Sequence, residues 1–177
     1  LLSSSPERFL KRVGNQLISQ PIKGTARRHT DQTHDVEEAF QLQRSEKERA
    51  ENTMIVDLVR NDMSRIATKG SVEVKELCKV YPFVHVHQMI STVVAELQAE
   101  TPVTDAIAAC FPMGSMTGAP KVRAMQLIEQ YEETKRGLYS GAVGYIDPNG
   151  DFDFNVVIRS LIYRKDIEYL SLQVGSA

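Results

Sequence analysis

Lys23 lies in a segment whose residue types could support covalent chemistry, Pro21-Ile22-Lys23-Gly24-Thr25. Proline removes a backbone donor and glycine relaxes the backbone, so we expect a loop or strand end where the lysine can face a cavity. A lysine in water has a pKa of about 10.4 and is a poor nucleophile at neutral pH, but burial or a cationic neighbour can make it reactive. An ordinary surface lysine is the more common outcome of such a pattern.

Two carboxylates are spaced to share one face of a helix. Glu48 and Glu51 are separated by three positions within 45–52, a polar segment of helical character. Carboxylate oxygens with room for water suit Mg²⁺, a hard cation. The alternative is a solvated charged face on which Lys47 and Arg49 pair with these acids.

A glycine-rich stretch, Pro112 to Lys121, precedes an amphipathic pattern. Backbone N–H groups at a helix N-terminus can bind an anion, either a carboxylate or a phosphate. The order of residues after Gly118 does not match the nucleotide-binding P-loop, so nucleotide binding is the weakest hypothesis. An ordinary connection before a helix is the alternative.

Arg159 lies in an otherwise apolar run that we predict to be a strand at 151–163. A buried guanidinium is costly unless it is paired. A bidentate carboxylate ligand would satisfy it, and an internal salt bridge is an equally good explanation.

The surrounding pattern predicts an α+β fold with antiparallel sheets flanked by helices. We expect a helical region at 35–63, capped by Asp35 and forming either one helix or two helices divided near Ser45, and further helices at 106–110 and 121–133. A loop is expected at 111–120. Strands are predicted at 10–18, 72–74, 77–84, 89–97, 139–146, 151–163 and 167–174, the last three forming one hairpin-linked sheet with a turn at 147–150.

Composition limits the classes of partner. The 177 residues carry a net charge of −2, which does not favour nucleic acid, and they contain no membrane-length apolar run. Two isolated cysteines, Cys78 and Cys110, indicate buried thiols in a reducing cytoplasm rather than a disulfide framework. The chain starts with Leu1-Leu2 and stops after a strand-like run, so we expect a piece of a larger protein.

Taken together, the motifs resemble the chorismate-binding family, which includes anthranilate, aminodeoxychorismate, isochorismate and salicylate synthases. The resemblance covers nearly the whole chain, and the ordered set is specific although each motif alone is weak. The motifs are Ser5-Pro6-Glu7-Arg8-Phe9, Pro21 to Thr25, Glu48 to Asn52 with Val56 to Asp62, Gly114 to Lys121, Gly141 to Tyr145, and Ile158-Arg159-Ser160.

The family resemblance implies both a fold and a reaction. Residues 1–177 would be part of one catalytic domain, the C-terminal portion of the anthranilate synthase component I-like fold. A lysine at the position of Lys23 is typical of aminodeoxychorismate synthases, whereas anthranilate and isochorismate synthases usually carry alanine. Lys23 would attack C2 of chorismate as the C4 hydroxyl leaves, and ammonia would then replace the lysine by adding at C4.

Further roles are implied by position. Glu7 matches the general acid, Glu51 a direct Mg²⁺ ligand and Glu48 a second, water-mediated one. The partners implied are chorismate and a glutamine amidotransferase subunit that supplies ammonia, in folate precursor synthesis. Contacts to substrate are implied for Thr25, Gly118, Ala119, Tyr145, Arg159 and Gly175.

The chain departs from the family pattern in two respects. Gln88 stands where the family usually has histidine, with His87 one residue earlier, which puts proton transfer at that place in doubt. The N-terminal half of the domain and the last helix with metal ligands are missing, so we expect this chain alone to be inactive or nearly so. The alternatives are an anthranilate or isochorismate synthase, and a non-catalytic piece that binds a chorismate-like ligand or a partner subunit.

Overall fold

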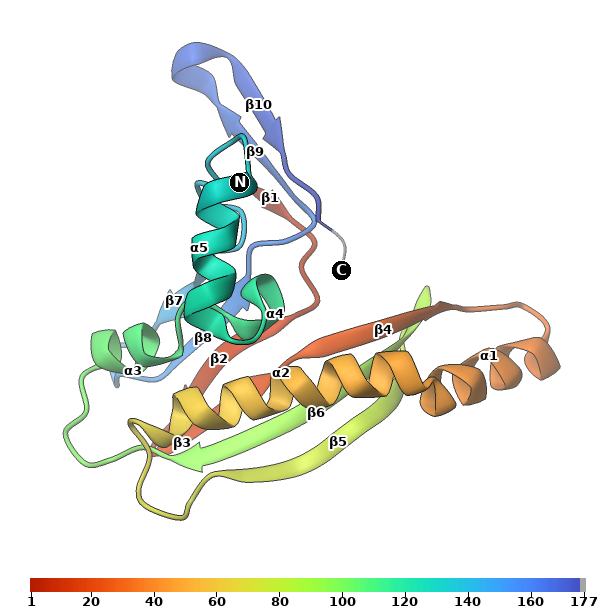
Figure 1. Cartoon of the computed structure of the whole chain (residues 1–177), viewed down its shortest axis with the longest axis horizontal. Helices are drawn as coiled ribbons and strands as arrows, with labels where there is room; N and C mark the ends of the chain where they lie inside the picture. The colour runs from red at the N-terminus through yellow and green to blue at the C-terminus, as the bar shows by residue number, and fades with distance from the viewer. Residues whose placement is uncertain (176–177) are drawn as a thin grey trace.

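The structure is a computed structural model that describes residues 1–175. It contains helices packed on antiparallel sheets, which confirms the predicted α+β class (Figure 1). Its helices are α1 (Gln32–Arg44), α2 (Glu46–Ser64), α3 (Val103–Cys110), α4 (Gly114–Thr117), α5 (Lys121–Tyr131) and the 3₁₀ turn η1 (Lys165–Ile167). Its strands are β1 (Leu2–Ser3), β2 (Arg8–Val13), β3 (Gln16–Gln20), β4 (Ile22–Arg27), β5 (Glu73–Pro82), β6 (Val86–Glu96), β7 (Ala142–Ile146), β8 (Phe152–Val156), β9 (Ser160–Arg164) and β10 (Tyr169–Leu172).

A seven-stranded antiparallel sheet forms the body of the described chain. Its order is β4-β6-β3-β2-β8-β7, and β5 pairs with the other side of β6. Strand β6 is long enough to pair with β4 near one end and with β3 near the other. Helix α2 lies along this sheet over β4, β5 and β6 (Figure 1). None of the helices within residues 1–175 is long and apolar enough to cross a membrane.

Two side chains set the helix boundaries near the sheet. The predicted division near Ser45 is confirmed, because Ser45 ends α1 and its hydroxyl accepts the N–H of Glu48 at the start of α2. The predicted cap at Asp35 was wrong. Asp31 caps α1 instead, and Asp35 accepts hydrogen bonds from Arg28 Nε and the His29 N–H at 2.8 and 2.9 Å.

Several predicted segments are divided or joined differently. The strand expected at 10–18 is a hairpin, because Gly14 turns the chain with a φ of 59° between β2 and β3. The strands expected at 72–74 and 77–84 are one strand, β5, with irregular register. The loop expected at 111–120 contains the short helix α4.

The prediction that Arg159 lies inside a strand was wrong, because β8 ends at Val156 and β9 begins at Ser160. The φ of 50° at Arg159 ends the extended backbone after β8, and the chain then enters a separate three-stranded sheet of order β1-β9-β10. The single hairpin-linked sheet expected at the C-terminal end was therefore wrong. The β9–β10 hairpin projects away from the rest of the described chain (Figure 1). The predicted segment 167–174 is confirmed only as β10, after the turn η1.

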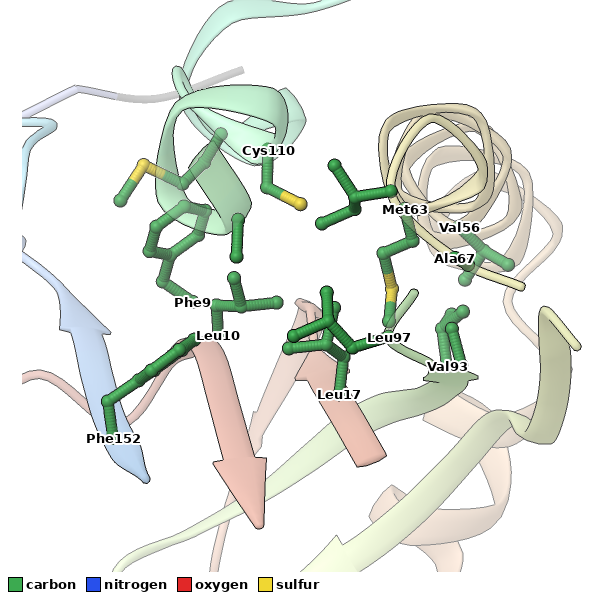
Figure 2. Packing of buried hydrophobic residues seen from close by; sticks show 14 of the residues in the cluster. Phe9, Leu10, Leu17, Val56, Met63, Ala67, Val93, Leu97, Cys110 and Phe152 are labelled. Carbon is green, nitrogen blue, oxygen red and sulfur yellow. The ribbon is translucent and has the colours of Figure 1, made fainter. Parts of the chain in front are cut away.

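The main core lies between the sheet and the helices. Leu10, Leu17, Met63 and Val93 are fully buried, and the core side chains labelled on β2, β3 and β6 lie between these strands, α2 and the helix ending at Cys110 (Figure 2). Both cysteines are buried and free, as predicted. This packing fixes α2 against the sheet, so that side chains on β4 and α2 hold constant relative positions.

Candidate active site

A cavity of about 540 Å³ lies beside the start of strand β4. Its wall is contributed by elements far apart in sequence: β4, α4, α5, the segment after α5, and the turns on either side of the β9–β10 hairpin. The lining includes Lys23, Thr25, Ser115, Met116, Arg136, Tyr139 and Arg159, with Gly175 at the end of the described chain.

The Lys23 amine occupies this wall next to a carboxylate of α2. Its Nζ atom lies 3.8 Å from Oε2 of Glu51, and Lys47 lies on the other oxygen at 3.7 Å. Both members of the Lys23–Glu51 pair are about one-quarter exposed. The amine is therefore accessible from the cavity and held in one direction by an ion pair.

Gly24 brings Glu48 to the same strand. With a φ of 93°, its backbone packs so closely on the helices that an added Cβ would lie 3.2 Å from Oε2 of Glu48 and 3.0 Å from Cδ1 of Leu42. The two predicted metal ligands thus project from one face of α2 toward β4, as their spacing predicted. Among residues 1–175, no group of three His, Cys, Asp or Glu side chains is arranged to hold a metal ion alone.

Glu7 is buried beneath this wall. Desolvation raises the pKa of its carboxyl from 4.5 to about 7, and this effect outweighs hydrogen bonding from Ser115 and the Ile22 backbone and the charges of Lys23 and Arg159, all of which lower it. Glu7 also lines a small cavity of about 20 Å³ whose lining shares Ser115 with the larger one. A carboxyl of this kind can hold a proton near neutral pH and release it into the adjoining space.

The structure brings only some of the predicted substrate contacts to the cavity. Thr25, Arg159 and Gly175 line it, whereas Gly118 and Ala119 lie just beyond the lining segment of α4. Tyr145 is placed on β7 opposite Asp153, where the residue is 59% exposed. The implied roles of all six remain predictions. Ser176 and Ala177, which follow Gly175 in its motif, lie outside the described residues.

Gln88, at the position where the family usually has histidine, does not line the cavity, and neither does His87. Gln88 is buried in β6 and pairs in register with Thr25 of β4. His87 is buried beside it, with Nε2 at 3.0 Å from Oδ1 of Asp35. In this arrangement Gln88 neighbours a cavity residue through the backbone, and His87 joins β6 to helix α1.

Two cavity residues were missed in the sequence. Ser115 belongs to the glycine-rich stretch, but nothing in the pattern connected it to Glu7. Arg136 lies in a charged segment that resembles a solvated turn, yet it lines the cavity and donates to the Met116 carbonyl at 2.7 Å. A single arginine ahead of Gly137 was the only sequence signal, and it is weak.

The whole chain, residues 1–177, matches the sequence profile of chorismate binding enzymes. This chain belongs to the chorismate-binding family. The match confirms the resemblance inferred from the ordered motifs.

Relatives in the family carry two different names. The chain is 46% identical over 161 residues to aminodeoxychorismate synthase component 1 of Escherichia coli strain K12, covering 91% of this chain and 36% of that protein. It is 42% identical over 175 residues to anthranilate synthase component 1 of Mycolicibacterium smegmatis, covering 99% of this chain and 33% of that protein. The chain therefore spans about a third of the length of these relatives.

A solved structure supports the fold assignment. Anthranilate synthase component I from Streptococcus pneumoniae TIGR4 superposes with a TM-score of 0.80 at 37% identity, over 90% of this chain and 34% of that one. The predicted anthranilate synthase component I-like fold is confirmed, and the place of this chain in the C-terminal portion of the domain stays a prediction.

Proposed function

We propose that this chain forms part of the active site of an enzyme that aminates chorismate to 4-amino-4-deoxychorismate. The observation that supports this most directly is the accessible amine of Lys23 on the cavity wall. The buried Glu7 carboxyl interacts electrostatically with this amine. A relative 46% identical to the chain is named aminodeoxychorismate synthase component 1, which supports the same choice.

The proposed reaction proceeds in two substitutions. Once its ammonium has released a proton to water, the amine of Lys23 forms a bond to C2 of chorismate, both ring double bonds shift, and the C4 hydroxyl leaves as water after accepting the proton of Glu7. Ammonia then forms a bond at C4, both double bonds shift back, and the C2–N bond breaks to return the lysine, while the nitrogen added at C4 gives a proton back to Glu7. Overall, chorismate and ammonia give 4-amino-4-deoxychorismate and water. Dividing one difficult displacement into two easier steps is the usual advantage of covalent catalysis.

Glu48 and Glu51 fit a Mg²⁺ ion by their chemistry. Mg²⁺ prefers oxygen ligands and commonly binds through one or two carboxylates, completing its shell with water and substrate oxygens. Both carboxylates face β4 beside the cavity, and Glu51 already attracts two ammonium groups. When bound there, Mg²⁺ would neutralise the ring carboxylate of chorismate. Arg159 and Thr25, which line the same cavity, would orient the substrate.

We further propose that the complete protein is cytoplasmic, serves folate precursor synthesis and receives ammonia from a glutamine amidotransferase subunit. The name "component 1" of the relatives implies a second subunit for those proteins. The chain alone would be inactive or nearly so, because the proposed metal site has only two carboxylates in the described residues.

A product assay on the complete protein distinguishes this proposal from its alternative. With chorismate, ammonia and Mg²⁺, we expect 4-amino-4-deoxychorismate, detected as 4-aminobenzoate after addition of the lyase. The anthranilate synthase of M. smegmatis at 42% identity makes anthranilate the specific second candidate. Formation of anthranilate or isochorismate would overturn the proposed product, and chorismate binding without turnover would support a non-catalytic role.

A further inference from the structure

Arg136 connects three separate segments at the cavity wall. Its Nη1 atom donates to the Met116 carbonyl of α4 at 2.7 Å and to Oγ of Ser140 at 3.0 Å. Its Nε and Nη2 atoms bind the carboxylate of Glu132, just after α5, at 2.6–3.1 Å. The guanidinium is about one-quarter exposed, and its carbon lies 5.8 Å from the ring centre of Tyr139.

These contacts use almost all of the donor capacity of the side chain. A guanidinium has five N–H groups, and four are directed at Met116, Ser140 and Glu132. A substrate carboxylate usually needs two parallel N–H groups for bidentate binding. Arg136 therefore faces the cavity with its bonding already satisfied by the protein, unlike a free substrate-binding arginine.

On one side, Arg136 holds the element that acts on Glu7. Met116 follows Ser115 directly in α4, a helix of only four residues. Such a short helix has few internal hydrogen bonds, and it ends at Gly118. Ser115 and Glu7 line the same small cavity, where the Ser115 side chain acts to lower the pKa of the Glu7 carboxyl. The hydrogen bond from Arg136 to the Met116 carbonyl therefore holds the neighbouring Ser115 in its position beside Glu7.

On the other side, Arg136 holds the turn next to Arg159. Ser140 is buried in a left-handed conformation with a φ of 66°, which is strained for a residue with a side chain. Its N–H donates to the Val157 carbonyl at 3.0 Å, and Val157 donates back to Gly141 at 2.8 Å. Arg159 follows two residues later and lines the cavity.

We propose that Arg136 is a positioning residue that holds α4 and the Ser140 turn together, so that Ser115 and Arg159 keep their places around Glu7. This inference rests on the proposed function in that Glu7 is taken to act on the substrate. The charged groups that act on Glu7 are Lys23 of β4 and Arg159. The nearby acid Asp62 is ion-paired with Lys121, and burial keeps the pKa of Cys110 at about 12, so that thiol is neutral.

The first test measures whether Arg136 holds α4 and the Ser140 turn in place, and it does not depend on any enzymatic reaction. In the complete protein, Arg136→Ala should increase backbone hydrogen exchange in peptides that cover 114–118 and 138–141. The matched control is Arg123→Ala on α5, whose guanidinium donates to the exposed Gln126 side chain at 3.3 Å; this substitution should leave these peptides unchanged. Unchanged exchange at 114–118 in Arg136→Ala would overturn the proposal, whatever reaction the enzyme performs.

The second test follows the loss of chorismate, so that it does not depend on the product. Arg136→Ala should lower kcat by about 10- to 100-fold, as misplacement of a reacting group does, with KM changed less than about threefold. The alkaline pKa of the kcat profile should rise, because Ser115 and Arg159 no longer favour ionised Glu7. Arg136→Lys, which keeps the charge but not the fork, should restore only part of kcat.

Two kinetic outcomes would contradict the positioning role. A KM raised about tenfold or more with an unchanged kcat profile would make Arg136 a substrate ligand. A lower melting temperature with unchanged kcat and unchanged pKa would make it merely structural. If the wild-type protein consumed no chorismate, the proposed function would fail, while the exchange measurement would still decide whether Arg136 holds α4.

Discussion

In this structure the Nζ atom of Lys23 on β4 lies 3.8 Å from Oε2 of Glu51 on α2. The ion pair joins the proposed nucleophile to the helix that carries both proposed metal ligands. The distance depends on how closely α2 packs on the sheet, and three fully buried residues contribute to that packing. Asn52 of α2 accepts a hydrogen bond from Ser91 of β6, and Ser91 accepts the backbone N–H of Cys78 at 2.8 Å.

Lys23→Ala should abolish amination in the complete protein. The nucleophile would be lost while the cavity, Glu7 and both carboxylates remain, so we expect a fall on the order of 10³-fold or more in kcat. Mass spectrometry of the quenched wild-type reaction should show a substrate adduct on Lys23 and none in the variant.

Lys47→Ala is the matched control for this substitution. Lys47 binds the other oxygen of Glu51 at 3.7 Å, but it is 69% exposed and does not line the cavity. Its loss removes one positive charge near Glu51, as Lys23→Ala does, and should leave kcat within about threefold because exposed pairs are weak. Equal losses in the two variants would assign the effect to charge rather than to nucleophilic attack.

Activity should depend on the protonation of Glu7. Its pKa of about 7 means that the protonated fraction decreases as pH rises through neutrality. An acid that must give up a proton therefore predicts a rate of chorismate loss that falls on the alkaline side. Glu7→Gln keeps the shape but cannot donate a proton, so we expect a loss of about 10²- to 10⁴-fold and a profile without that alkaline fall. Retention of the fall in Glu7→Gln would assign it to another group.

The same residue makes a prediction about stability. Because the folded pKa of Glu7 is raised above 4.5, the folded state binds more protons than the unfolded state between that value and about 7. Stability from this group is present at low pH and is lost as pH rises through the window. Glu7→Gln should therefore raise the free energy of unfolding at about pH 8 by on the order of 3 kcal/mol, and change it little at about pH 4.5. A larger gain at the lower pH would contradict the direction of the shift.

The sequence was sufficient to predict the class of fold and to identify the candidate site residues on β4 and α2. The i, i+3 spacing of Glu48 and Glu51 needs only the geometry of one helix, and Ser45 ends α1 by local hydrogen bonding. Apolar periodicity likewise identified α2 and β6, because long buried elements keep a regular pattern.

The strand predictions were wrong at places where the backbone conformation of a single residue decides whether a strand continues. Arg159 is apolar-flanked and looked like a strand residue, but its left-handed φ separates β8 from β9. Gly14 similarly turns an apparently continuous strand into a hairpin. Ser115 acts on Glu7, and Arg136 binds Met116, across segments that are separated in the sequence. No local residue spacing encodes either interaction.

The buried ion pair between Asp62 and Lys121 should stabilise the approach of α5 to α2. Asp62 is 4% exposed and Lys121 15% exposed, so removal of one partner leaves a charge without compensation. Burial raises the pKa of Asp62, which indicates that desolvation outweighs even the stabilisation by Lys121. Lys121→Met should lower the free energy of unfolding by about 3–5 kcal/mol, and the double variant with Asp62→Asn should recover much of that loss. Lys135→Met, which breaks an exposed pair with Glu129, should cost less than about 1 kcal/mol; equal costs at the two sites would contradict a buried pair.

Gly24→Ala should disturb the site without removing any reactive group. The residue has a φ of 93°, and a Cβ there would lie 3.0 Å from Leu42 and 3.2 Å from Glu48, so the side chain would be strained and would push α2 away from β4. We expect a lower melting temperature together with a weaker dependence on Mg²⁺ and a loss of kcat of about tenfold or more, because Glu48 and Glu51 would move relative to Lys23. Gly70→Ala is the control, since Gly70 has a similar φ of 80° but open space around the added carbon. If both substitutions lowered stability equally and neither changed kcat, the close contact at Gly24 would have no part in arranging the site.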